Sequence, residues 1–197
     1  MNYDNEMKKI IKTLNYKPKL LLQSCCAPCS TTVIEVLKDF FDLTILYYNP
    51  NIEPFEEYEK RKKEQIKIIE YYGLKYLDCD YDNEIFHKMA KGLECEPEKG
   101  IRCHKCYRLR LDYTAKKAKE NNFEYFSTTL TVSPYKLSKV INEIGLELES
   151  TYDVKYLVSD FKKNNGYKRS IELSNKYDLY RQNYCGCIYS KRSNINE

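Results

Sequence analysis

The sequence predicts an α/β protein: a Rossmann-like three-layer sandwich with a parallel sheet, followed by a mostly helical C-terminal part. Two observations predict this class. Short apolar runs have the length and composition of buried strands, at residues 19–24, 42–49, 74–80 and 124–131. Segments of helical length separate these runs, and strands that alternate with helices pair in parallel through right-handed crossovers.

The first elements follow from the N-terminal pattern. Residues 5–14 are expected to form a helix ahead of the strand KLLLQS, and residues 30–41 to form the next helix. Ser30, Thr31 and Thr32 are its candidate N-caps, because a hydroxyl oxygen accepts a hydrogen bond from a free N–H group of the first turn. These boundaries leave the cysteine-rich stretch CCAP in the turn between strand and helix.

Three further helices are expected in the middle of the chain, at residues 57–73, 83–92 and 103–122. The first should end at Gly73, because glycine readily adopts the left-handed conformation that ends many helices. From Pro134 on, the pattern is weaker and mostly helical.

Length and composition bound the domain organisation. A chain of 197 residues with 42% hydrophobic content can bury one sizeable core and is short for two. We expect one domain over residues 1–197, with a core at about 19–130 and a helical part at about 134–190. No apolar stretch approaches a membrane span and the charged N-terminus lacks a secretory signal, so we expect a cytoplasmic protein with no membrane partner.

Three of the nine cysteines follow the first strand: Cys25, Cys26 and Cys29. Ligands of open parallel sheets bind at the carboxyl ends of the strands, and a helix N-terminus lowers thiol pKa values there. A single free cysteine is commonly a core residue, but three within five positions indicate metal or redox chemistry. An odd total in a reducing compartment also argues against a disulfide framework.

A second cluster, Cys103 and Cys106, has the C-x-x-C spacing with which two thiolates clamp one metal centre. With the first cluster it completes a four-thiolate set. The pair C-x-x-C and C-x-x-C also matches a zinc site, but the segment between them is far longer than in a zinc ribbon and contains two expected strands. A structural zinc therefore ranks below an iron–sulfur cluster.

A third cluster, Cys185 and Cys187, is separated only by Gly186. A disulfide across three residues closes a small strained ring, and strain raises the reduction potential of a disulfide, which suits a labile redox couple. The alternatives are a further pair of metal ligands or mere proximity in sequence.

Basic and aromatic residues interleave in the segments around the third cluster, FKKNNGYKRS and LYRQNY. Such a mixture suits phosphate contacts combined with stacking on an unpaired base, and the candidate RNA-binding residues are Lys168, Arg169 and Arg181. A charge run is more often a solvated face. The net charge of +4 permits a polyanionic partner without requiring one.

These segments together resemble the cobalamin-independent epoxyqueuosine reductases, a family that acts on transfer RNA. The resemblance runs from about residue 19 to 190 and rests on LLLQSCCAPCS, YYNPNIEP followed by EY and R, GIRCHKCYRLRL, FSTTLTVSPYK, DFKKNNGYKRS and LYRQNYCGC, in that order. It implies reductive removal of the epoxide oxygen of epoxyqueuosine at the wobble position, which gives queuosine. The implied partners are tRNA carrying epoxyqueuosine in its anticodon loop and an unidentified electron donor.

The resemblance also implies roles for individual residues. Four cysteines are then the ligands of a 4Fe-4S cluster: Cys25, Cys26, Cys103 and Cys106. Cys185 and Cys187 form a redox-active disulfide pair, and Cys29 is a candidate ligand of an additional mononuclear iron. For the reaction that the resemblance implies, three side chains are candidate proton donors: Asp160, Tyr107 and Tyr135.

Three other functions compete with this interpretation. A thioredoxin-like thiol–disulfide oxidoreductase shares the local order of strand, C-A-P-C and helix, but it explains neither Cys25 nor the pair Cys103 and Cys106. A zinc-bearing RNA-binding module leaves Cys185 and Cys187 without a role. A sulfur-transfer enzyme that activates nucleotides would carry glycines, not cysteines, in the first loop.

Overall fold

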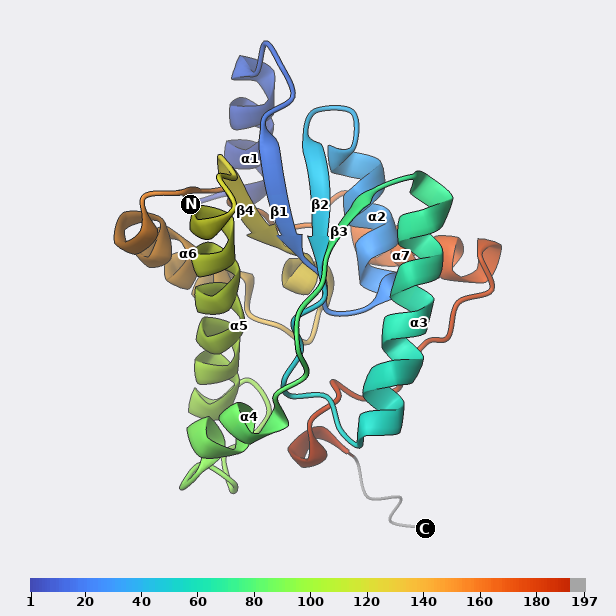
Figure 1. Ribbon diagram of the computed structural model, residues 1–197, viewed down its shortest axis with the longest axis vertical. Coiled ribbons are helices and arrows are strands. Elements are labelled where there is room, and N and C mark those ends of the chain that lie inside the picture. The colour runs from blue at the N-terminus through green and yellow to red at the C-terminus, as the bar shows by residue number, and fades with distance from the viewer. Residues whose placement is uncertain (192–197) are drawn as a thin grey trace.

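The computed structural model describes residues 1–191; the last positions of the expected domain, 192–197, lie outside the described residues. Its centre is one parallel sheet with the strand order β3-β2-β1-β4-β5 (Figure 1). The strands are β1 (Lys19–Gln23), β2 (Asp42–Leu46), β3 (Lys75–Leu77), β4 (Tyr125–Thr128) and β5 (Lys155–Tyr156). The predicted α/β class with a parallel sheet is confirmed.

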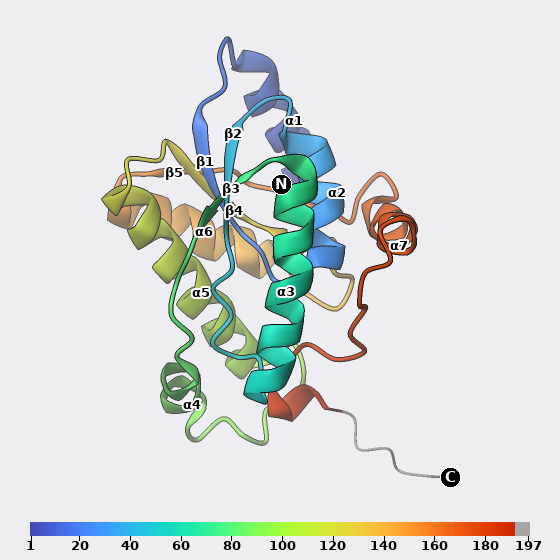
Figure 2. The same ribbon diagram turned by 45° about the vertical axis from the view of Figure 1, so that its right-hand side comes forward.

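Helices cover both faces of this sheet, which gives three layers (Figure 2). On one face lie α2 (Ala27–Leu37), α3 (Phe55–Tyr72) and α7 (Gly166–Lys176), together with α1 (Tyr3–Thr13) near the amino ends of the strands. On the other face lie α4 (Asn83–Ala90), α5 (Ile101–Glu120) and α6 (Ser138–Tyr152). None of the helices in the described part of the chain is both long and apolar enough to cross a bilayer.

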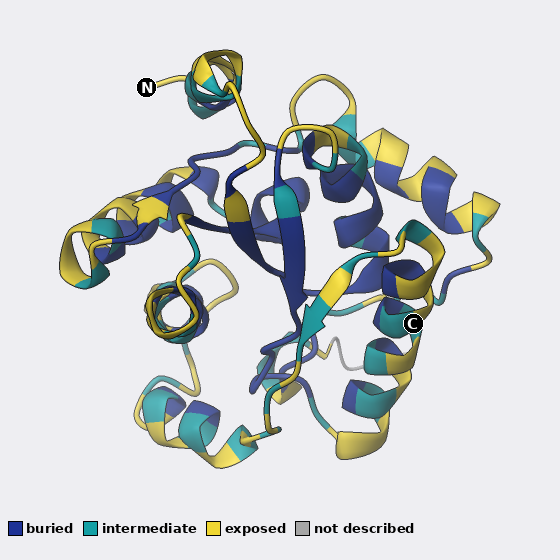
Figure 3. Ribbon diagram, turned by 45° about the horizontal axis from the view of Figure 1, so that its top comes forward, coloured by how far each residue is buried: buried dark blue, intermediate teal, exposed yellow. Residues whose placement is uncertain are grey.

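The central strands are buried on both sides (Figure 3). Successive side chains of a strand point to opposite faces, so Leu20 and Leu22 pack under α2 and α3 while Leu21 packs under α5 and α6. Because both faces are covered, the strand reads as a continuous apolar run and not as an alternating one. The helices, in contrast, are exposed along their outer sides.

The carboxyl ends of the central strands meet at one edge of the sheet. Gln23, the last residue of β1, pairs with Leu46 at the end of β2 and with Thr128 at the end of β4. The strand order reverses between β1 and β4, and such a switch point opens a crevice in which ligands of open α/β sheets bind. The segments that follow β1 and β4 therefore come together.

The start of α2 corrects one expectation. The proposed N-cap at Ser30, Thr31 or Thr32 is wrong, because α2 begins at Ala27 and Cys26 is its N-cap. Ser30 Oγ lies inside the helix and donates to the carbonyl of Ala27 at 3.0 Å. The proline in the first turn supports this earlier start, since proline lacks only an N–H group that the first turn leaves unpaired. The cysteines therefore lie at the very start of the helix.

The region after β4 differs in two further ways from the expected pattern. The strand expected at residues 124–131 ends at Thr128, and its last residues belong to the 3-10 helix η1 (Thr129–Val132). The strand β5 within the C-terminal part was not expected, and it joins the same sheet beside β4. Expected helix ends elsewhere agree closely, and α3 stops at Gly73 in the left-handed conformation as predicted.

Candidate active site

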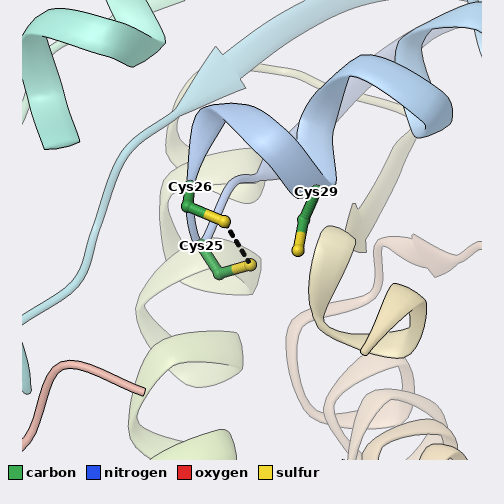
Figure 4. A group of neighbouring side chains, drawn as sticks. All are labelled: Cys25, Cys26 and Cys29. Atoms are coloured by element: carbon green, nitrogen blue, oxygen red, sulfur yellow. Dashed lines mark hydrogen bonds between the residues drawn. The ribbon is translucent and has the colours of Figure 1, made fainter. Parts of the chain in front are cut away.

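Three thiols form a compact group at the carboxyl edge of the sheet (Figure 4). Cys25 and Cys26 follow β1, and Cys29 lies in the first turn of α2. Their sulfur atoms all lie within 4.8 Å of one another, and the Sγ atoms of Cys25 and Cys26 are 3.8 Å apart. This spacing and donor type fit a soft metal centre that prefers thiolate ligands.

Local hydrogen bonds favour negative charge on one of these thiols. Thr129 Oγ1 donates to Cys25 Sγ at 3.2 Å and accepts from the backbone N–H of Cys25 at 3.0 Å. Hydrogen bonds from Cys26 and Cys29 hold the pKa of Cys25 well below its usual range. The same interaction raises the pKa of Cys26 to about 11 and raises the pKa of Cys29. Among the three thiols, Cys25 is therefore the one whose surroundings most favour the ionised form.

A cavity of about 210 Å³ lies beside the three thiols. Its other walls include Lys136, Arg110 and the segment 181–185 that follows α7. Three tyrosines also line it: Tyr135, Tyr167 and Tyr184. After α7 the chain runs along α3 toward the carboxyl edge of the sheet, which brings Cys185 to this cavity (Figure 1). Residues far apart in sequence thus share one polar and aromatic pocket.

A smaller adjoining cavity of about 30 Å³ is lined by four cysteines: Cys103, Cys106, Cys185 and Cys187. The two cavities share six lining residues: Glu98, Arg110, Tyr135, Lys136, Cys185 and Ser190. Burial, with smaller contributions from nearby Cys185 and Cys187, raises the pKa of Cys106 to about 12. Cys103 Sγ accepts a hydrogen bond from the backbone N–H of Lys99 at 3.3 Å.

The structure thus brings the three cysteine motifs to one edge of the sheet. Cys103 packs against the apolar cluster that contains Cys25 and Cys26. Within residues 1–191, however, only Cys25, Cys26 and Cys29 form a group with metal-binding spacing, and Cys103 and Cys106 lie outside that group. The donors in these motifs are all thiols, and thiolates are the ligands of iron–sulfur centres, so the donor chemistry fits such a centre.

Two cations face both cavities. Arg110 is 2% exposed, and its guanidinium donates to Asn49 Oδ1, while Asn49 Nδ2 donates to the carbonyl of Ser24 at 2.8 Å. Burial alone would lower the pKa of Lys136, but the negative charges of Cys185 and nearby cysteines outweigh it and raise that pKa. The walls shared by the two cavities therefore carry two cations, Arg110 and Lys136, and one carboxylate, Glu98.

The candidate proton donors lie in different surroundings. Tyr135 is 55% exposed and lines both cavities, whereas Tyr107 is buried and lines the smaller one. Asp160 lines neither cavity: it accepts from Ser138 Oγ at 2.7 Å and pairs with Lys162 at 2.9 Å. Its carboxylate holds the start of α6 in place.

The candidate RNA-binding residues also lie in different surroundings. Arg181 lines the larger cavity and donates to the carbonyl of Ser170 at 3.2 Å. Arg169 forms a two-point ion pair with Glu35 at 3.0 and 3.1 Å, and Lys168 is exposed. Much of the charge of Arg169 is therefore neutralised within the chain.

Four residues that contribute to the site were not assigned a role from the sequence: Lys136, Arg110, Thr129 and Arg61. All four lie in or next to the segments that carry the family resemblance, which was the available signal. Neither charge nor hydroxyl content in those segments indicates which side chain faces the cysteines. That information comes from the strand order, which places β4 beside β1.

Sequence comparison decides the family. A family model described as epoxyqueuosine reductase QueH matches residues 20–193. This chain belongs to that family. Epoxyqueuosine reductases are oxidoreductases of tRNA modification. The family that the sequence motifs predicted is therefore confirmed.

Curated relatives carry the same description over most of their length. The epoxyqueuosine reductase QueH of Staphylococcus epidermidis is 45% identical, with 96% of this chain and 84% of the relative aligned. That of Streptococcus pyogenes is 43% identical, with 98% and 79% aligned, and that of Thermotoga maritima is 36% identical, with 87% and 89% aligned.

Solved structures with a similar fold are more distant. One is the U34-tRNA thiolase NcsA from Methanococcus maripaludis with its 4Fe-4S cluster, at a TM-score of 0.57 and 14% identity, covering 96% of this chain and 67% of that chain. Another is a predicted subunit of tRNA methyltransferase from Methanocaldococcus jannaschii, at a TM-score of 0.54 and 17% identity, covering 81% and 74%. At these identities the likeness concerns the Rossmann-type fold alone.

Proposed function

We propose that this chain reduces epoxyqueuosine to queuosine in tRNA at the cavity beside Cys25, Cys26 and Cys29. The observation that carries the proposal is the convergence of the three cysteine motifs on two adjoining cavities at the carboxyl edge of the sheet. The reaction consumes two electrons and two protons, releases the epoxide oxygen as water and leaves a carbon–carbon double bond. A thiol pair and an iron–sulfur cluster can both transfer electrons, which a purely hydrolytic site does not need.

In this proposal Cys25, Cys26, Cys103 and Cys106 hold a 4Fe-4S cluster. When bound, the cluster supplies electrons one at a time. Cys26 is the N-cap of α2 and Cys103 lies in the first turn of α5, and at both helix N-termini the backbone dipole favours thiolate ligands. Cys29 is then available to ligate an additional mononuclear iron, because its sulfur lies in the same close group.

The larger cavity would accept the modified base in a flipped-out conformation. Tyr135, Tyr167 and Tyr184 line it, and aromatic side chains stack on unpaired bases. Gln182 Oε1 is a buried acceptor without a partner in the part of the chain that the structure describes, and Gln182 lines the same cavity. The guanine-like edge of the base presents N–H groups, and this oxygen could accept a hydrogen bond from one of them.

Lys136 would stabilise the epoxide oxygen as its bonds to carbon break. Lys136 lines both the larger and the smaller cavity, so its ammonium group is a candidate hydrogen-bond donor to a ligand in either. A fixed donor aimed at developing negative charge lowers the barrier more than the same donor in water does. Tyr135, at the mouth of both cavities, is the tyrosine best placed to pass a proton.

Cys185 and Cys187 would act as a redox pair. Oxidation of two thiols to one disulfide releases two electrons and two protons, which equals the demand of one epoxide reduction. An electron donor, a two-electron reductant of the dithiol class, would then restore the thiols. Both cysteines are free thiols in the structure and line the smaller cavity.

The test is a turnover assay with anaerobically reconstituted protein, a chemical reductant and an anticodon stem-loop that carries epoxyqueuosine. Mass spectrometry of the nucleosides should show queuosine in excess over protein. The same RNA incubated with reductant but without protein is the control for chemical reduction. An intact cluster and a competent reductant without any conversion would overturn the proposal.

A further inference from the structure

Arg61 is a charged side chain that is only 2% exposed, and its guanidinium is directed at the backbone beside Cys185. Nη1 donates to the carbonyl of Cys185 at 3.1 Å and Nη2 to the carbonyl of Tyr184 at 3.4 Å. Nε donates to Glu57 at 2.7 Å, one turn earlier on α3. The planar fork of arginine therefore spans a carboxylate on its own helix and two carbonyls of a distant segment.

The next carbonyl of that segment is held from the same end of α3. The backbone N–H of Glu53 donates to the carbonyl of Gly186 at 3.0 Å, and Tyr184 Oη donates to the carbonyl of Glu53 at 2.9 Å. Three successive carbonyls, those of Tyr184, Cys185 and Gly186, are thus fixed by residues at the start of α3. No regular helix or strand contains these residues, so side-chain anchors define their conformation.

Gly186 shows how closely the anchor approaches. Its φ of +121° is a conformation that side chains rarely allow. A Cβ atom at this position would lie 2.7 Å from Ile52 Cγ1 and 3.1 Å from Arg61 Nη1. The glycine between the two cysteines therefore permits the arginine contact as well as the backbone turn.

We propose that Arg61 is a positioning residue that holds Cys185 and Cys187 in the open dithiol form. This inference rests on the proposed function in treating the two cysteines as a redox pair. The contacts of Arg61 are made with both cysteines present as free thiols. A disulfide between residues two apart in sequence constrains the dihedral angles of the backbone between them. Arg61 and Glu53 fix the carbonyls of that backbone while both thiols are free, so the anchor stabilises the dithiol relative to the disulfide.

The anchor favours regeneration of the pair. Each turnover converts two thiols to a disulfide, with two electrons and two protons passed to the substrate, and the electron donor must supply the same number to reopen it. Stabilising the dithiol makes that return step more favourable. Loss of Arg61 should therefore slow repeated turnover while leaving the first turnover of pre-reduced protein intact.

The decisive measurement is the dithiol–disulfide equilibrium of Cys185 and Cys187 in the full chain, anaerobically reconstituted and free of RNA. Wild-type protein and three variants are equilibrated in mixtures of reduced and oxidised dithiothreitol, alkylated and analysed by mass spectrometry: Arg61→Lys, Arg61→Ala and, as a control on the exposed side of α3, Lys63→Ala. We expect Arg61→Ala to shift the equilibrium at least about tenfold toward the disulfide, which is a midpoint about 30 mV more negative.

Arg61→Lys should give a smaller shift in the same direction, because lysine keeps the charge but cannot reproduce the two-carbonyl fork. Lys63→Ala should match wild type. A folded Arg61→Ala or Arg61→Lys protein with the wild-type equilibrium would overturn the inference, because a merely structural role predicts lower melting without a change in potential. If Arg61→Ala does not fold, the result for Arg61→Lys decides.

A companion variant tests the same anchor from its other end. Tyr184→Phe removes the hydroxyl that donates to Glu53 and should also shift the equilibrium toward the disulfide. Iron content should stay at the wild-type level in all variants. The equilibrium is measured without substrate, so it tests the role of Arg61 separately from the proposed function. Protein that never converts epoxyqueuosine would overturn the proposed function but would not change the interpretation of this equilibrium.

Discussion

The cysteines at the start of α2 and those in the C-terminal segment meet at the same site but are supported in opposite ways. Cys25 and Cys26 follow a fully buried strand and Cys26 caps a buried helix, so the sheet itself fixes them. Cys185 and Cys187 lie in a segment without regular structure that hydrogen bonds from α3 fix. A metal ligand needs a constant position, whereas a redox pair must change its geometry in each cycle. The difference in support therefore agrees with the proposal that the first cysteines are metal ligands and the second a redox pair.

The largest effect is expected from removing a rigidly held ligand. Cys25→Ser should abolish both iron binding and turnover, and it should lower the melting temperature of reconstituted protein, because metal binding couples to folding. Iron and sulfide analysis together with calorimetry checks this. Cys95→Ser, an exposed cysteine in a loop, is the matched control and should keep about four irons per chain. Full iron content in Cys25→Ser would contradict the assignment of Cys25 as a cluster ligand.

Lys136 lies between the two regions, and its removal should affect the chemical step. Lys136→Met should lower kcat/KM by about 10²- to 10³-fold, the usual cost of losing one donor to a developing oxyanion. The optical spectrum of the cluster should be unchanged. Lys139→Met, an exposed lysine of α6, serves as control and should keep wild-type kinetics. A Lys136→Met enzyme within twofold of wild type would place the stabilising group elsewhere.

The C-terminal pair should separate first turnover from later ones. Cys185→Ser and Cys187→Ser should give less than one product per pre-reduced chain and should then turn over at least about tenfold more slowly, because the remaining cluster delivers single electrons and one epoxide requires two. Rapid-quench measurements with limiting and excess RNA distinguish the two phases. Unaltered multiple turnover in both variants would make the pair incidental.

The basic residues should differ in their contribution to RNA affinity, but these differences should be smaller than the effects on turnover. Lys168→Ala should reduce the slope of log affinity against log salt by about one, because one phosphate contact releases about one counterion. Arg169→Ala should change it less, since Glu35 already neutralises that guanidinium. Fluorescence anisotropy with an anticodon stem-loop at several salt concentrations measures both. Equal slopes for the Lys168→Ala variant and wild type would move the binding surface away from the start of α7.

Asp160 should give the smallest effect on activity. Asp160→Asn removes a carboxylate that binds Ser138 and Lys162, so we expect a loss of about 1 kcal/mol in stability. Because Asp160 lines neither cavity, kcat should change little. Denaturant unfolding and steady-state kinetics test the two halves of this expectation. A tenfold fall in kcat at constant KM would restore Asp160 as a proton donor.

The sequence was sufficient to predict four of the five strands, because a strand that is buried on both faces reads as a continuous apolar run. Leu20, Leu21 and Leu22 form a continuous apolar run, and Gly73 marks a helix end that requires positive φ. The start of α2 was misplaced because Ser30 and Thr31 look like N-caps, whereas their hydroxyls bond to carbonyls within the helix. The strand β5 has only two residues, too few to show a period.

For the site, the cysteine motifs were visible in the sequence but their surroundings were not. Lys136 and Arg110 lie far from the cysteines of the first cluster in sequence, and only the pairing of β4 beside β1 and the position of α5 bring them there. Arg61 gave no signal of burial, since it lies within the charged run EYEKRKKEQ. Charge runs usually indicate solvated faces, and one inward-facing arginine does not change the pattern.

The most direct test of the division between rigid ligands and an anchored redox pair uses two cysteines that line the same small cavity, Cys106 and Cys187. Cys106→Ser and Cys187→Ser proteins are reconstituted side by side without oxygen, and iron and acid-labile sulfide are measured per chain. The account predicts that Cys106→Ser loses the cluster while Cys187→Ser keeps about four irons with matching sulfide. Loss of iron from Cys187→Ser with retention in Cys106→Ser would contradict it.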